Sequence, residues 1–274
     1  MIELLGLYLW PLLSALMLAI ALSLTGTQLV AREWSVRSLV VAQSSTVGIL
    51  FGIAITFLFE PHPLWSFAVV TSAGTVFSLL IATLLGVERF RLKRPQALLT
   101  VFVVLSAIAA IFTALVPKLE ANMSAVYAGD ITTLSNLEAR LHLGFGLGIT
   151  AYLWKNWSRL SLSAFRNVVL GTPESGSTIK TFTLSTMLLV ALGVQGLGLS
   201  FVLACLFLPT SLIAGTDQSL RRHQIHVVLI SSTGTFLGFL ISLADTRLPT
   251  TAVIVLAQLV IGFGIRFITT RTRS

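Results

Sequence analysis

The chain has 274 residues, a formal net charge of +8, a mean hydropathy of +0.93 and only 10% charged side chains. A soluble domain carries about 25% charged residues, so the composition excludes an ordinary soluble fold and indicates an integral membrane protein. The charged residues lie in short segments between long apolar stretches, and no apolar stretch has a charge at its centre.

A helix needs about 20 mostly apolar residues to cross about 30 Å of hydrocarbon. The apolar stretches of this chain predict an all-α, polytopic bundle of transmembrane helices, with residues 1–274 forming one domain. The opening segment MIELLGLYLW has no basic region and no cleavage motif, so we expect it to belong to the first span. The stretches comprise residues 4–30, 39–59, 64–85, 96–116, 141–154, 181–216, 227–244 and 250–265.

The uncharged run 181–216 is too long for one span. Its 36 residues would measure about 54 Å as a single helix. The segment GVQGLG offers glycines at which the chain can turn. We therefore predict a helical hairpin broken near Gly196, which brings the total to nine spans.

The basic residues predict the orientation of the chain. With the hairpin, fifteen of the 18 Lys and Arg residues fall on one side, and only Lys118, Arg140 and Arg247 lie opposite. A single span would change this split to eleven and seven. Because cytoplasmic loops are enriched in Lys and Arg, we expect the N-terminus outside and the C-terminus in the cytoplasm. Basic loops that face anionic lipid explain the pI of 10.6 without nucleic-acid binding.

The spans contain almost no ionisable groups. His142 is the exception, and its place near the outer end of a span beside Arg140 predicts an interfacial histidine that reaches water. No histidines, cysteines or carboxylates have the spacing of a metal site within a span, so we predict no metal ligands. The single cysteine, Cys205, excludes an intrachain disulfide.

Small and polar residues are candidates for helix packing or for a hydrated path. Three glycine pairs each have a spacing of four residues, which places both members on one helix face and lets helices approach closely. The polar run from Gln43 to Thr46 faces all round its helix, so it either forms interhelical hydrogen bonds or lines a hydrated path. The glycine pairs are Gly48 and Gly52, Gly144 and Gly148, and Gly234 and Gly238.

The loops contain no phosphate-binding GxxxxGK[ST] motif and support no nucleophile or acid–base set. We therefore expect no catalytic residues and no cofactor bound by this chain. The one long cytoplasmic connection, about residues 155–180, includes Leu160, Phe165, Val168 and Val169, which can share one side of a short helix. Such an amphipathic segment either lies on the lipid surface or docks a cytoplasmic partner.

Seven segments recur in a characteristic order along nearly the whole chain. They are MIELL, AREW followed by Arg37, SSTVGILFGI, RFRLKRPQALL, VYAGDITTLSN, QGLGLSFVLACLFLPTSLIAG and LADTRLPTTAVIVLAQLVIGF. In the order and spacing of these segments, more than in any one of them, the chain resembles the permease subunits of the ABC-3 family, the zinc, manganese and iron type of metal importers.

The resemblance implies a membrane subunit in the bacterial plasma membrane that works by alternating access. Its implied partners are an external solute-binding protein, a cytoplasmic ATPase that uses the ATP, and a second permease, expected to be an identical copy. The ATPase would dock on residues 158–171, where Arg159 and Arg166 are available to carboxylates and Phe165 lies between them, up to Gly171. We expect the polar groups Gln43, Ser44 and Gln195, at and near the hairpin, to line the path, with helix packing alone as the alternative.

The chain departs from the family at its metal-binding positions. The family's second span usually bears an aspartate and, four residues later, a histidine, and the corresponding positions here are Leu39 and Gln43. The family's histidine in the fourth span is also missing. Three alternatives to divalent-metal import follow: a permease for another solute or a chelated metal, a metal-incompetent partner subunit, or a membrane protein that does not transport.

Overall fold

The structure is a computed structural model that describes residues 8–59, 62–86, 95–129, 131, 134–172, 176–215, 219–244 and 248–271. Every regular element within these residues is helical, which confirms the predicted all-α fold. The opening residues 1–7, the basic segment 87–94 and Arg247 lie outside the described residues. The elements are α2 (Leu9–Ala31), α3 (Ser35–Phe59), α4 (Pro63–Gly86), α5 (Pro95–Leu115), η2 (Pro117–Leu119), α6 (Glu120–Ala128), α7 (Asn136–Leu170), α8 (Ser177–Ile213), α9 (Leu220–Ala244) and α10 (Thr250–Arg271).

Seven of the described helices are long and apolar enough to cross a membrane, namely α2, α3, α4, α5, α8, α9 and α10. Helix α7 has 35 residues and is not among them, and charged residues lie in both of its halves, Glu138 and Arg140 in the first and Lys155, Arg159 and Arg166 in the second. The chain is therefore a multi-pass membrane protein. Helix α6, with nine residues, is too short to span, and it falls in a segment that we expected to be a loop.

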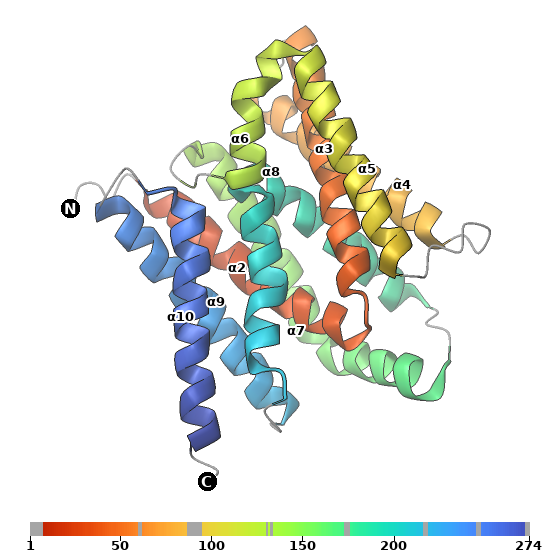
Figure 1. Ribbon diagram of the computed structural model, residues 1–274, viewed down its shortest axis with the longest axis vertical. Helices are drawn as coiled ribbons and strands as arrows, with labels where there is room; N and C mark the ends of the chain where they lie inside the picture. Colours follow the sequence, from red (N-terminus) through yellow and green to blue (C-terminus); the bar gives the residue numbers. More distant parts are fainter. Residues whose placement is uncertain are drawn as a thin grey trace.

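Helix α8 is broken at Gly198, two residues from the predicted position. Gly198 has φ 81° and ψ 160°, a backbone conformation that is essentially restricted to glycine. Gly129, after α6, lies directly against this break, and a Cβ on Gly198 would stand 2.6 Å from the Gly129 nitrogen. Figure 1 shows the two arms of α8 meeting near the centre of the molecule and both running downward in the view from that point, the first arm also to the right.

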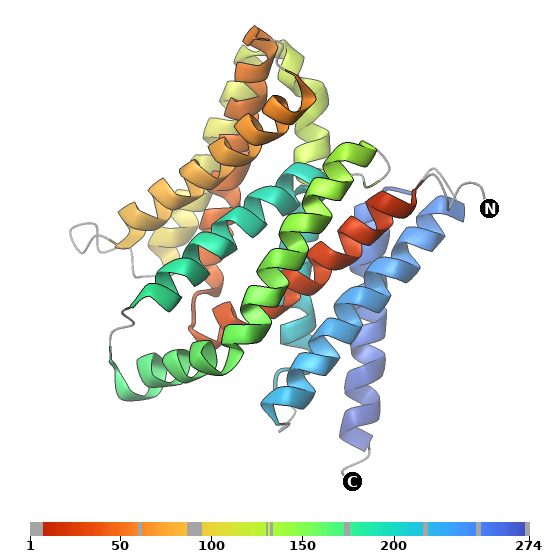
Figure 2. The same ribbon diagram turned by 180° about the vertical axis from the view of Figure 1, so that it is seen from behind.

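Helices α2 and α8 form the centre of the bundle. In Figures 1 and 2, α2, α7 and the first arm of α8 run beside one another, with α3 to α6 on one side and α9 and α10 on the other. Gly26 brings α2 onto the second arm of α8, since a Cβ there would fall within 2 Å of the Leu206 carbonyl oxygen. Leu18 and Leu22 of α2 and Phe201 of α8 are among the large side chains fully buried in the core.

Two of the predicted glycine pairs lie at helix contacts. A Cβ on Gly48 would stand 2.6 Å from the Ala73 oxygen of α4, and Gly52 also lies against α4. Gly234 and Gly238 lie against Gln258 and Ile254 of α10. These two pairs therefore allow the close approach of α3 to α4 and of α9 to α10.

Gly144 and Gly148 differ from these pairs. A Cβ on either would meet nothing within 4 Å in the described chain, so the predicted packing role is wrong within one subunit. The reason is that α7 buries its other side, with His142, Gly146 and Ile149.

Helix α7 extends much further than the predicted span. Ser135 and Glu138 form a capping box at its start, and Gly171, with φ 64°, ends it. No glycine or proline lies between residues 149 and 170 to interrupt the helix. The connection expected over residues 155–180 is therefore helical up to Leu170, and its last turns run sideways near the bottom of Figure 1.

Candidate translocation path

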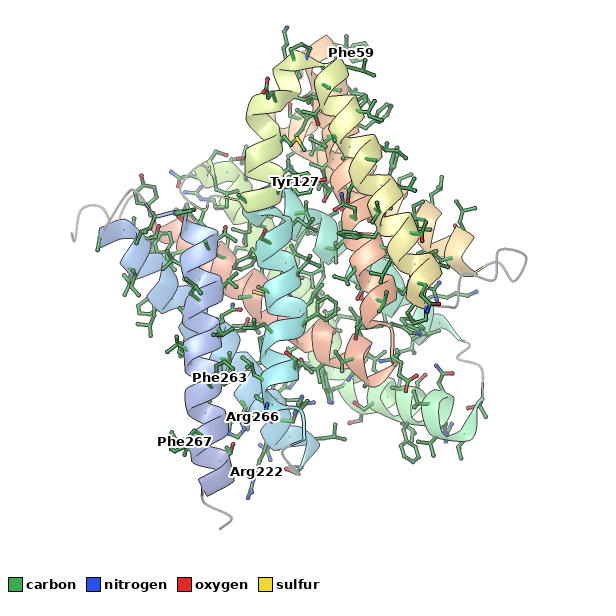
Figure 3. The ribbon with its side chains drawn as sticks, in the orientation of Figure 1. Phe59, Tyr127, Arg222, Phe263, Arg266 and Phe267 are labelled. Atoms are coloured by element: carbon green, nitrogen blue, oxygen red, sulfur yellow. The ribbon has the colours of Figure 1, made fainter. Side chains whose placement is uncertain are left out.

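Gln43 of α3 is fully buried and contacts α6. Its Nε2 lies 2.7 Å from Tyr127 Oη, and its Oε1 has no hydrogen-bond partner in the described chain. Reversing the amide would only exchange the two atoms. One polar atom of Gln43 is thus left without a protein partner, and buried polar atoms of this kind are uncommon. Figure 3 shows Tyr127 near the centre of the molecule, at the end of α6.

The rest of the polar run on α3 is also buried. Ser44 donates to the Val41 carbonyl at 2.7 Å and Thr46 to the Ala42 carbonyl at 3.2 Å, so both hydroxyls bond to their own helix. Ser45 Oγ has no partner in the described chain, and it lies close to Gly74 of α4. Ser44, a predicted path residue, therefore does not share the contacts of Gln43.

Gln195 lies on the first arm of α8, three residues before the break. Its Oε1 accepts a hydrogen bond of 2.5 Å from Thr71 Oγ1 on α4. Gln195 and Gly196 line a cleft between α3, α4, α6, α7 and α8 that encloses about 1040 Å³, part of it open to solvent. The cleft lining does not include Gln43 or Ser44, so the structure does not join the three predicted path residues in one cavity.

The polar lining of this cleft also contains Ser66, Glu138 and His142, which the sequence did not indicate as path residues. A carboxylate and an imidazole four residues apart lie on one face of a helix, and this spacing was readable in the sequence. The Glu138 carboxylate is occupied locally, because its Oε2 accepts from Ser135 Oγ at 2.7 Å.

His142 is buried, with 1% of its surface exposed, and the predicted interfacial histidine is wrong. Its Nδ1 lies 2.7 Å from the Glu138 carbonyl oxygen and its Nε2 lies 3.0 Å from the Leu192 carbonyl oxygen. The edge of the ring meets Phe67 at 5.2 Å between centroids. Because α8 covers this side of α7, the histidine turns inward even though the neighbouring Arg140 is exposed.

The described residues contain no group of three or more His, Cys, Asp and Glu side chains that could hold a metal ion. Leu39 and Gln43 supply no charged ligand on α3. The path candidates of the described chain are therefore neutral hydrogen-bonding groups, apart from Glu138 and His142 at the cleft.

Comparison with known proteins decides the family. The model of the ABC 3 transport family matches residues 6–269. The chain belongs to the ABC 3 transport family. This confirms the resemblance read from the sequence, and it makes the chain a membrane subunit of an ABC transporter.

Two solved structures share the fold of this ABC 3 family member. PsaBC from Streptococcus pneumoniae, solved in complex with a Fab, gives a TM-score of 0.73 at 18% identity and covers 94% of this chain and 89% of that chain. An inward-facing transporter assigned to the metal-chelate type gives a TM-score of 0.62 at 18% identity, and the match covers 95% of this chain and 85% of that chain. No curated protein sequence matches the chain.

The last turns of α7 give this ABC 3 family member an exposed surface at the end of the bundle. Phe165 is 56% exposed, and Arg159 and Arg166 are exposed as well. Leu160 differs from the prediction, because only 1% of its surface is exposed and it packs into the core. The exposed apolar residues in the last turns of α7 are therefore Leu162, Phe165, Val168, Val169 and Leu170.

Proposed function

We propose that the chain is the membrane permease of an ATP-driven importer in the plasma membrane, with zinc, manganese or iron as its solute. An external binding protein would deliver the solute, a separate ATPase would hydrolyse ATP in the cytoplasm, and two copies of the permease would form the path. The family match over residues 6–269 carries this proposal. The fold shared with PsaBC and with a transporter assigned to the metal-chelate type supports it.

The proposed route begins at the cleft. A cation would enter beside Glu138, His142 and Gln195, and would pass Gln43 by alternating access. Gln43 offers an amide oxygen that can replace one hydration oxygen of a cation without neutralising its charge. The cation would therefore pass partly hydrated, and the external binding protein would supply most of the affinity.

A chelated metal is the second candidate solute. Leu39 and Gln43 stand where the family usually places Asp and His, and a chelator would cover the charge that this path leaves unpaired. Uptake of radioactive zinc, manganese and iron by cells with and without the gene tests both solutes. Loss of free-ion uptake supports the first, and loss restricted to a chelate supports the second.

The proposed topology has nine spans, with the N-terminus outside and the hairpin of α8 counted as two. Two features of α8 support this topology. Its backbone is broken at Gly198, and both of its arms run from the break toward the same side of the bundle. We expect Ser219→Cys and Thr272→Cys to react with an impermeant maleimide only from the cytoplasm, and His62→Cys only from outside. Cys205 is buried and gives little background. Labelling of Ser219→Cys from the external side would reject the hairpin. Thr272 is not among the described residues, so its position is tested by labelling alone.

Gln43 gives a direct test of the path. Gln43→Ala removes the amide oxygen that would replace a hydration oxygen of the cation, so uptake should fall modestly. Gln43→His should create or tighten divalent-metal binding, measured by titration calorimetry on the purified permease. Ser72→His, on an exposed position of α4, adds the same imidazole away from the path and should bind no metal. A submicromolar site in the unmodified protein would show that the ligands lie elsewhere.

A further inference from the structure

A mainly apolar cavity lies between α2, α3, α4 and α8, near the ends of these helices that the proposed topology places in the cytoplasm. It encloses about 550 Å³, part of it open to solvent. Ala82 of α4 and Met187 and Val190 of α8 form its apolar wall, and Trp34 and Arg37 lie at the start of α3. The cavity is therefore built from apolar walls and one cationic side chain.

Arg37 is half-buried beside this cavity. Its Nη2 donates to the Ala82 carbonyl at 2.8 Å, and its Cζ lies 5.4 Å from the centroid of the Trp34 ring. No carboxylate of the described residues forms an ion pair with Arg37. A guanidinium has five N–H donors, so donors remain for an anion. Within the described part of the chain, Arg37 is therefore a partly desolvated cation with no carboxylate beside it, and an anionic ligand would relieve the cost of its burial.

A second cavity adjoins the first. It shares Trp34 and Thr183 with the first cavity, encloses about 810 Å³ including open space, and is lined by Asn167 of α7 and Lys180 of α8. Lys180 is exposed and has no described carboxylate in ion-pair contact. The two cavities thus share Trp34, and one cationic residue lines each of them, Arg37 the first and Lys180 the second.

We propose that the adjoining cavities bind one anionic phospholipid of the cytoplasmic leaflet. The phosphate lies at Trp34 between Arg37 and Lys180, and one acyl chain follows Met187 and Val190 into the apolar cavity. Basic pockets between transmembrane helices on the cytoplasmic side suit anionic head groups, and tryptophan favours the interfacial depth. The choice of leaflet rests on the proposed orientation of the helices.

This lipid would also contact the segment proposed to bind the ATPase. Asn167, in the second cavity, lies one residue after Arg166 on α7. An acidic lipid would therefore hold the last turns of α7 against the start of α8. The occupant that we infer is the lipid, and a carboxylate from the ATPase is the competing outcome of the test.

The test reads quenching of Trp34 fluorescence by brominated lipid. The full-length chain, with the other four tryptophans replaced by phenylalanine, is placed in phosphatidylcholine nanodiscs that contain a small fraction of brominated phosphatidylglycerol or of brominated phosphatidylcholine. We expect the anionic lipid to be preferred by about fivefold for each basic residue. Arg37→Gln and Lys180→Gln should each lower the preference by that factor. Arg222→Gln, which removes an exposed cation near Arg266 (Figure 3), should leave it unchanged.

Ala82→Phe fills the apolar cavity and keeps both charges, so it tests the acyl chain separately from the phosphate. We expect it to remove the preference. Equal quenching by the two lipids in the unmodified chain, or an equal loss in Arg222→Gln, would overturn the proposal. If neither brominated lipid quenches Trp34 but Arg37→Gln lowers recovery of the ATPase with the permease, the occupant is a protein carboxylate and the proposal is overturned. The assay involves no transport, so its failure leaves the proposed function untouched.

Discussion

We expect Phe165→Ala and Arg166→Glu to reduce ATP-driven uptake by an order of magnitude or more while the permease remains folded. Both side chains are exposed on the last turns of α7, so their replacement leaves no cavity in the bundle. Burial of a phenylalanine in a partner interface is worth about 2 kcal/mol, which is about 30-fold in binding. Reversal of the charge at Arg166 would repel a carboxylate on the ATPase.

The measurement uses the reconstituted transporter and records ATP hydrolysis, uptake and recovery of the ATPase with the permease. Leu256→Ala and Arg221→Glu are matched controls, because both residues are exposed and lie outside the last turns of α7. Both controls should behave as the unmodified protein. If both α7 variants keep normal uptake per ATP, the ATPase does not dock on this segment.

Gly198→Ala should cause a severe loss of stability. The backbone at φ 81° and ψ 160° excludes other residues at a cost of about 1–3 kcal/mol. The new Cβ would also stand 2.6 Å from the nitrogen and 2.7 Å from the Cα of Gly129, and such overpacking adds about 1–3 kcal/mol. We expect a strongly lowered unfolding temperature in detergent and little assembled protein.

Gly264→Ala on α10 is the control for this substitution. A Cβ there meets nothing within 4 Å, and the residue lies inside a helix. Alanine should therefore stabilise the helix slightly, by about 0.5–1 kcal/mol. If Gly198→Ala and Gly264→Ala unfold at the same temperature, the break in α8 does not need glycine.

The helices were predictable from the sequence because burial in lipid demands long apolar stretches. The length of the uncharged run 181–216 also predicted that its helix must break. Three nearby glycines could each have formed the break, so the length alone did not select one of them. The contact with Gly129 selects Gly198, and this contact joins residues 69 positions apart. Helix α6 was missed because it lies in a short charged segment between two apolar stretches, which we expected to be a loop, although its Ala, Glu and Met residues favour a helix.

The candidate path was less predictable. The pairing of Gln43 with Tyr127 and that of Gln195 with Thr71 each join different helices, so neither can be read from local pattern. His142 looked interfacial because Arg140 is close in sequence, yet the Leu192 carbonyl of α8 fixes it inside the bundle. The sequence shows which residues within the spans are polar, but the packing of the helices against one another determines which of these side chains are in contact.

The most direct test of the permease assignment is solute uptake into proteoliposomes that contain the chain, its ATPase and its binding protein. We expect ATP-dependent accumulation of at least one of free zinc, manganese or iron, abolished when the chain is omitted. Accumulation of a metal only as its chelate would favour the second candidate solute. Accumulation of no metal in either form, with ATP hydrolysis intact, would contradict the assignment of the chain as a metal permease.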